Sequence, residues 1–226
     1  MTTYGRLGSA ALAVTVLLPA VLGASSEVRP GTIEARVTDQ KGKLVEDAVI
    51  SLVPARAVAS GARPTPAVMD QFDKEFIPYV LPISVGTPVN FPNRDDIRHH
   101  VYSFSEAKRF ELPLYSGTPA VPVVFDKPGV VVLGCNIHDW MVGYIYVMTT
   151  PYFAKTGPDG VARLTDVPAG DHDVQVWHPR LQTEKSITVK PVTAAGETIP
   201  VSFIVTLKRE WRAPRGPGRY ERPQGG

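Results

Sequence analysis

The chain alternates apolar and polar residues in short runs separated by turns that contain glycine or proline, and this leaves few folds open to it. The run TIEARVTD (32–39), the turn QKGK and the run AVISLVP (48–54) predict the two strands of a hairpin. Residues 156–179 repeat this pattern with turns at PDG and PAG, and VSFIVTL (201–207) predicts a last strand. Because no segment shows a sustained helical period, the sequence predicts an all-β protein built from β-sandwiches.

The composition is that of a globular protein. Of the 226 residues, 43% are hydrophobic and 20% are charged, which is enough apolar surface for a packed core. The formal net charge of +2 argues against a dedicated nucleic-acid-binding protein. The single cysteine, Cys135, excludes both an intramolecular disulfide and a zinc site made of several thiolates.

Residues 1–25 have the features of a secretory signal peptide. Arg6 is the only charged residue before Glu27, and the 17 residues 7–23 are all apolar or small. Small residues at 23–25 are typical of a cleavage site. The alternative is an uncleaved anchor helix, for which the run is short. We therefore expect an exported protein with no integral membrane span after cleavage.

The other end of the chain also differs from the body. Residues 208–226 contain six Lys or Arg against two Asp or Glu, and Pro or Gly recurs every few residues. This composition predicts a disordered basic tail. Contact with an anionic surface is an alternative role for it.

One loop in the middle of the chain carries three candidate metal ligands. FDKPGVVVLGCNIHDWMVGYIYVM (125–148) predicts two strands joined by a tight loop with Cys135, His138 and Met141. These residues are three apart, so a compact loop can turn a thiol, an imidazole and a thioether toward one point. Together with an upstream imidazole they would make the His₂Cys set with a weak axial Met that is typical of blue copper sites. Bound as a thiolate, the unpaired cysteine would also be protected from oxidation.

Two adjacent histidines can supply the upstream imidazole. The strand–turn–strand FIPYVLPISVGTPVNFPN (76–93) is followed by RHHVYSF (98–104), which predicts another strand containing His99 and His100. Adjacent side chains of a strand face opposite sides, so only one of the two can reach the metal.

Residues 66–149 resemble the plastocyanin and amicyanin group of cupredoxins. The C-x-x-H-x-x-M spacing matches the short amicyanin loop, including an aromatic residue, Trp140, just before the Met. GYIYV (143–147) matches the closing strand, and VGTPVNFPN followed by His and VYSF matches the strand with the first imidazole. The resemblance implies a Greek-key β-sandwich that binds one mononuclear type 1 copper ion.

The resemblance also implies a role for each matched residue. Cys135 would be the thiolate ligand, His138 the second imidazole, whose solvent-facing edge passes the electron, and Met141 the axial thioether. His99 would be the first imidazole, because the family places this ligand directly before a residue that is commonly Asn and is here His100. His100 remains the alternative to His99.

Two residues depart from the family pattern. His100 in place of Asn alters the surroundings of the cysteine sulfur, which tune the reduction potential. Asp139 stands where the short loop usually has Pro. A carboxylate beside the exposed imidazole is expected to change partner choice and to raise the pKa of His138.

The flanking segments resemble a different family. VTDQKGKLVEDAVISL (37–52) and TGPDGVARLTDVPAGDHDVQV (156–176) resemble the two hairpins of the carboxypeptidase regulatory, transthyretin-like β-sandwich. This implies a discontinuous domain, 28–58 with 150–207, into which the cupredoxin domain is inserted. A tandem of two unrelated sandwiches is the alternative.

These inferences favour a monomeric periplasmic protein that carries single electrons to or from a redox protein such as a c-type cytochrome or a dehydrogenase. An enzyme is not expected, because the sequence lacks a nucleophile elbow, a phosphate loop, H-E-x-x-H and the paired H-x-H motifs of multicopper oxidases. The alternatives are a copper carrier or sensor without an electron partner, and a cell-envelope β-sandwich binding module.

Several other polar and sulfur-containing residues have a simpler interpretation. Packing or surface positions are expected for His172 and His178, core positions for Met69 and Met148, and either packing or the rim of the site for Trp140 and Tyr144. Positions near turns are expected for Asp70, Asp73, Asp95 and Asp96.

Overall fold

The computed structural model describes residues 30–54, 64–182 and 188–209, and every regular element in these ranges is a β-strand. The prediction of an all-β protein is therefore confirmed. In the described part of the chain, no helix is long and apolar enough to cross a membrane. The predicted signal peptide (1–25) and all but two residues of the predicted tail (208–226) lie outside these ranges.

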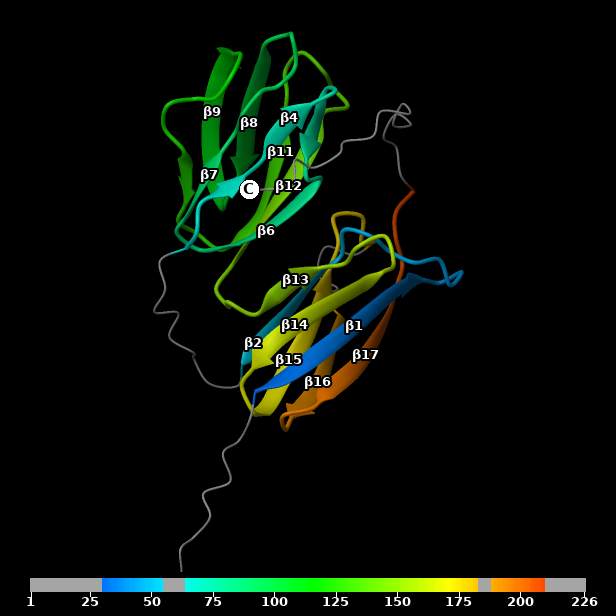
Figure 1. Ribbon diagram of the computed structural model, residues 1–226. Coiled ribbons are helices and arrows are strands. Elements are labelled where there is room, and N and C mark those ends of the chain that lie inside the picture. The colour runs from blue at the N-terminus through cyan, green and yellow to red at the C-terminus, as the bar shows by residue number, and fades with distance from the viewer. Residues whose placement is uncertain (1–29, 55–63, 183–187, 210–226) are drawn as a thin grey trace, which may run out of the picture.

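The first sandwich is built from strands at both ends of the sequence (Figure 1). One sheet has the order β14-β1-β17 and the other has the order β13-β2-β15-β16. The strands are β1 (Gly31–Asp39), β2 (Val49–Pro54), β13 (Phe153–Lys155), β14 (Val161–Val167), β15 (Gly170–Trp177), β16 (Thr188–Ala194) and β17 (Thr198–Val205).

Alternation along the strands explains this sandwich. In β1, Ile33, Ala35 and Val37 are fully buried, whereas the residues between them are not. They pack in one core with apolar residues of the other sheet such as Leu52 and Val174. The period of two found in the sequence therefore marks the face of each strand that forms the core.

The second sandwich comes from the middle of the chain. Its larger sheet has the order β6-β12-β11-β8-β9, its smaller sheet has the order β10-β7-β3, and a separate hairpin pairs β4 with β5. The strands are β3 (Ala67–Val68), β4 (Asp70–Phe72), β5 (Glu75–Ile77), β6 (Val80–Ser84), β7 (Thr87–Asn90), β8 (His99–Ser105), β9 (Lys108–Tyr115), β10 (Val123–Phe125), β11 (Gly129–Gly134) and β12 (Val142–Met148).

Aromatic side chains fill the centre of the second sandwich. Phe91 and Phe125 are buried, and the ring of Phe110 lies 5.5 Å from the first and 5.9 Å from the second, centroid to centroid. Val131 and Leu133 of β11 belong to the same core. This core is separate from that of the first sandwich.

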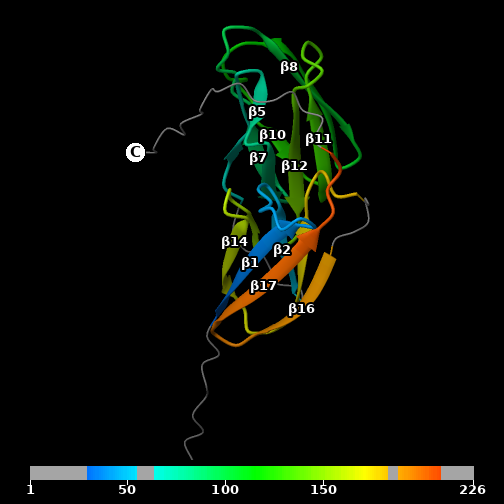
Figure 2. The same ribbon diagram turned by 90° about the vertical axis from the view of Figure 1, so that its right-hand side faces the viewer.

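A third apolar cluster joins the two sandwiches. Val49 of β2 is buried against Val80 and Met148 of the second sandwich. The ring of Trp177, at the end of β15, lies 4.8 Å from that of Tyr146, centroid to centroid. Figures 1 and 2 show how β12 leads from one sandwich into the other.

Several strands were not predicted from the sequence, and β9 and β16 are the longest of them. β9 has no fully buried residue, and its sequence KRFELPLY mixes charged residues and a proline with apolar residues. β16 contains Pro191 and lies at the edge of its sheet, where a missing N–H is tolerated. The relation of the first sandwich to the transthyretin-like family stays a prediction.

The aromatic core generates a stability prediction. Phe91→Ala should lower the free energy of unfolding by about 3–5 kcal/mol, because Phe91 is only 1% exposed and its removal leaves a cavity. Phe104→Ala is the matched control, because Phe104 is 75% exposed and its loss should change stability by less than about 0.5 kcal/mol. Denaturant unfolding measures both, and equal effects would contradict the assignment of the core.

Candidate metal centre

Three strand ends meet at one end of the second sandwich. Gly134, the last residue of β11, pairs with Tyr102 of β8 and with Val142 of β12. Both neighbours are antiparallel to β11, so the beginnings of β8 and β12 lie beside the end of β11. His99 begins β8, and the loop from Cys135 to Met141 joins β11 to β12.

This arrangement brings a thiol and two imidazoles together. The Cys135 sulfur lies 3.8 Å from Nδ1 of His99 and 3.9 Å from Nδ1 of His138. The three candidate ligand atoms all lie within 4.8 Å of one another. Bonds of about 2.1 Å to one ion in a trigonal plane would place ligand atoms about 3.6 Å apart. The cluster can therefore close around a single ion with small adjustments.

Met141 is the last residue of the loop. Its side chain is only 1% exposed and belongs to the same apolar cluster as Cys135. Its backbone N–H donates to the carbonyl of His138 at 3.0 Å, which closes the turn between the two residues. The donor set of His99, Cys135, His138 and Met141 is typical of a type 1 copper site.

The two adjacent histidines face opposite ways. Nε2 of His100 lies 2.8 Å from a carboxylate oxygen of Glu111 on β9, and its ring packs against that of Tyr102. His100 therefore belongs to the other face of the sheet. Of the two imidazoles, His99 is the one beside Cys135.

The sequence indicated a position near a turn for Asp95 but not its contact with His99. An oxygen of the Asp95 carboxylate lies 2.7 Å from Nε2 of His99, on the side of the ring opposite Cys135. The two residues are four apart in the sequence, which is the one signal that could have suggested the pair. Burial raises the pKa of Asp95, but hydrogen bonds from the N–H groups of Lys74 and Asp73 and from His99 outweigh it, so the net shift is downward.

The same carboxylate holds a strained turn. Asp73 and Lys74, between β4 and β5, both have positive φ angles, 53° and 58°. Such angles are uncommon for residues other than glycine. Their N–H groups donate to the two carboxylate oxygens of Asp95 at 2.7 and 2.9 Å. The tip of the β4–β5 hairpin is thus tied to a residue that contacts the metal centre.

The pKa of His138 is lowered. Burial is the main cause, and the neighbouring His99 and Lys74 act in the same direction. The carboxylate that opposes them is Asp95. The expectation that Asp139 raises the pKa of His138 is therefore wrong, because Asp139 is exposed and its charge is screened by solvent.

Two exposed apolar residues, Ile137 and Trp140, neighbour His138 in the loop. Ile137 is 48% exposed and Trp140 is 47% exposed, and the ring of Trp140 lies 5.3 Å from that of His138. Trp140 therefore belongs to the rim of the site, one of its two expected roles. Tyr144 instead packs edge-on against Tyr79, with ring centroids 5.3 Å apart.

The remaining candidates occupy packing positions. His172 is buried and Nε2 contacts the carbonyl of Pro168 at 2.6 Å. His178 is also buried, and its Nδ1 accepts a hydrogen bond from the N–H of Arg180. Met69 and Met148 lie in apolar clusters. Within residues 30–54, 64–182 and 188–209, only His99, Cys135 and His138 form a group of three potential metal ligands.

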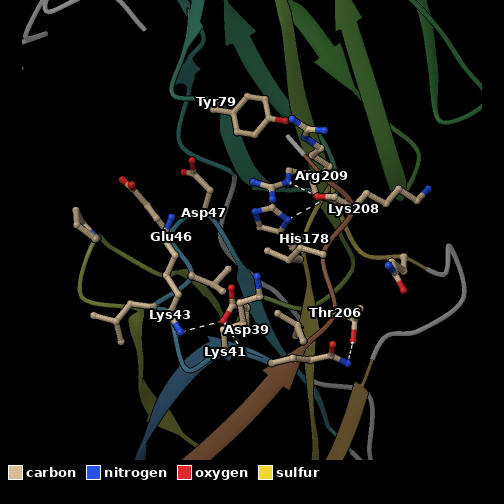
Figure 3. A pocket seen from close by; sticks show the side chains of 18 residues that line it. Asp39, Lys41, Lys43, Glu46, Asp47, Tyr79, His178, Thr206, Lys208 and Arg209 are labelled. Atoms are coloured by element: carbon tan, nitrogen blue, oxygen red, sulfur yellow. Dashed lines mark hydrogen bonds between the residues drawn. The ribbon is translucent and has the colours of Figure 1, made fainter. Parts of the chain in front are cut away.

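A cavity of about 850 Å³ lies in the first sandwich beside Tyr79 (Figure 3). Its cationic lining residues are Lys41, Lys43, Arg180, Lys208 and Arg209, and its acidic ones are Asp39, Glu46 and Asp47. Because groups of both signs line it, the cavity does not select one class of charged ligand. It shares no residue with the cluster around Cys135.

Comparison with known proteins gives partial similarities. No family model matches the chain, and no curated protein matches it. A copper-containing nitrite reductase (NirK) from Thermus scotoductus SA-01 is similar at 32% identity over 42% of this chain and 25% of its own, with a TM-score of 0.35. The chain thus spans about a quarter of that enzyme.

Two smaller solved structures are similar over their whole length. A purple cupredoxin from Nitrosopumilus maritimus has 25% identity over 37% of this chain and 100% of its own, with a TM-score of 0.32. A reduced Cu(I) form of an amicyanin variant has 24% identity over 46% of this chain and 100% of its own, with a TM-score of 0.33. TM-scores this low do not establish a shared fold. The assignment of the metal site therefore depends on the distances between its residues.

Tyr115 is half-buried and forms hydrogen bonds with two residues of the second sandwich. Its hydroxyl donates to the carbonyl of Phe91 at 2.7 Å and accepts a hydrogen bond from the amide of Gln71. Burial raises the pKa of Tyr115 to about 12; the hydrogen bond from Gln71 opposes this rise, and the nearby Cys135 adds to it.

We predict that Tyr115→Phe removes a phenol that titrates near pH 12. The folded protein holds this proton more tightly than the unfolded chain, where the pKa is about 10. The contribution of Tyr115 to stability is therefore complete below about pH 10 and is lost as the pH rises through the folded pKa. Tyrosinate absorbance and denaturant unfolding across this range measure both effects, and identical curves for the variant and the native protein would contradict the assignment.

Proposed function

We propose that this protein binds one copper ion at His99, Cys135, His138 and Met141 and carries single electrons between redox proteins in the periplasm. The observation that carries the proposal is the convergence of the Cys135 thiol with two imidazole nitrogens within 4.8 Å. When bound, copper would supply the one-electron couple. The protein residues supply the ligand field, the rigid geometry and the route to the surface.

The chemistry of the donors favours copper over other metals. A thiol and a thioether are soft ligands, which select against calcium and magnesium. Imidazole suits copper, and one sulfur with two nitrogens and a weak axial thioether is the set of an electron-transfer site rather than of a closed structural zinc site. Burial of Cys135 and Met141 keeps both sulfur atoms away from solvent oxidants.

The rigid ligands favour an electron carrier over a protein that stores or releases the ion. His99 is held at Nε2 by Asp95, and the N–H of Met141 holds the carbonyl of His138. Cys135 follows directly on β11, whose last residue pairs with both neighbouring strands. Ligands fixed in this way rearrange little when the charge of the ion changes, so each transfer has a low barrier.

His138 is the ligand that can meet a partner. It is only partly buried, and Ile137 and Trp140 are exposed beside it. Redox proteins form brief complexes through small interfaces. A partner such as a c-type cytochrome or a dehydrogenase would dock over this apolar rim, with the His138 edge as the exit of the electron.

The domain arrangement that we propose places the copper site in an insertion. Residues 66–149 would form the cupredoxin domain, and 28–58 with 150–207 would form the discontinuous domain that carries it. The separate apolar cores of the two sandwiches and the small cluster between them support this division. Export by residues 1–25 would place both domains in the periplasm.

Addition of copper(II) to the metal-free protein tests the proposal. We predict an intense visible absorption band from charge transfer between the Cys135 thiolate and the metal. Cys135→Ser should abolish the band, because no other thiol is present in the chain. His100→Gln is the matched control and should keep the band, because His100 faces Glu111 rather than the site.

A band that survives Cys135→Ser, or that disappears in His100→Gln while the variant stays folded, would overturn the ligand assignment. Absence of the band in the native protein would overturn the copper proposal itself.

Repeated redox cycling separates an electron carrier from a copper carrier. We predict that chemical reduction bleaches the band, that oxidation restores it fully, and that a copper(I) chelator in the solution removes little metal during the cycle. The reason is that the buried donors hold the ion in both states. Quantitative loss of copper on reduction would instead indicate a protein that delivers the metal.

A further inference from the structure

We propose that Asp95 is a positioning residue that orients the His99 imidazole toward the metal and lowers the reduction potential of the site. The inference rests on the proposed copper function, but it concerns a residue outside the ligand set. It follows from the geometry of one carboxylate that contacts both a ligand and the backbone of a neighbouring hairpin.

The two ring nitrogens of His99 have different neighbours. Nε2 lies 2.7 Å from the Asp95 carboxylate, and Nδ1 lies 3.8 Å from the Cys135 sulfur. An ionised carboxylate can only accept a hydrogen bond, so Nε2 must carry the proton. The lone pair then lies on Nδ1, which is the nitrogen that faces Cys135. Asp95 therefore selects the tautomer that can bind the metal.

Asp95 is itself fixed on several sides. Its two oxygens accept the N–H groups of Asp73 and Lys74, and its own N–H donates to the Asn93 side chain at 3.0 Å. The side-chain amide of Asn93 in turn donates to the carbonyls of Ile97 and Tyr115. These bonds hold the loop from 93 to 97 in place, so the carboxylate cannot follow a rotation of the ring.

The negative charge of Asp95 has an electrostatic consequence. The side chain of His99 is fully buried and that of Asp95 is 12% exposed, so solvent screens their interaction only weakly. A nearby negative charge that also makes the imidazole more basic stabilises the more positive oxidation state of a bound ion. Asp95 should therefore favour copper(II) over copper(I).

The experiment compares Asp95→Asn with Asp96→Asn. Asp96 is the next residue and is exposed, so its substitution removes the same charge without a contact to His99. In Asp95→Asn, we expect the ratio of copper(II) to copper(I) affinity to fall about tenfold, which raises the potential by about 59 mV for one electron. In Asp96→Asn, the potential should stay close to that of the native protein.

A measurement on the metal-free native protein keeps the proposal testable even if a variant does not fold. In the metal-free native protein, nitrogen NMR of the His99 ring in mildly alkaline solution should show the proton on Nε2. A proton on Nδ1 would overturn the proposal, as would equal potentials for the Asp95 and Asp96 variants when both are folded and bind copper. Failure of the native protein to bind copper, with the Nε2 tautomer present, would refute the copper function and leave the orienting contact standing.

Discussion

The pairing of β8, β11 and β12 is the constraint on which the metal centre depends. β11 lies between two antiparallel neighbours, so one end of the sheet collects the end of β11 and the beginnings of the other two strands. His99 and Cys135 then meet although 36 positions separate them in the sequence. The other candidate ligands, His138 and Met141, lie in the loop that follows Cys135 and are brought to the same end of the sheet.

The two imidazoles of the cluster have unequal surroundings. His99 is fully buried and held from behind by Asp95, whereas His138 is partly exposed and bordered by apolar side chains. One ligand therefore anchors the site to the body of the sandwich, and the other presents it to the surface. This division gives the proposed carrier a fixed geometry and a place for brief contact at the same time.

The sequence was sufficient to predict the ligands that lie in one loop of the site. Cys135, His138 and Met141 lie in a single loop, so their spacing alone predicted that they could turn toward one point. The preference for His99 over His100 came from a family resemblance and agrees with the alternation of side chains along β8. The all-β class followed from the period of two, which is a local property of each strand.

Contacts between segments that are distant in the chain could not be predicted from the sequence. Asp95 looks like an ordinary turn residue, and its role depends on the backbone of a hairpin twenty or so residues earlier. The prediction for Asp139 failed because a residue next to His138 in the chain points into solvent, while the carboxylate that acts on it comes from another loop. β9 was missed because none of its residues is fully buried and because charged residues and a proline lie among its apolar ones.

X-ray absorption at the copper edge of the loaded protein tests the central claim most directly, because it counts the atoms that bind the metal. We predict one short bond to sulfur and two bonds to imidazole nitrogen. A first shell of oxygen and nitrogen without sulfur would contradict it.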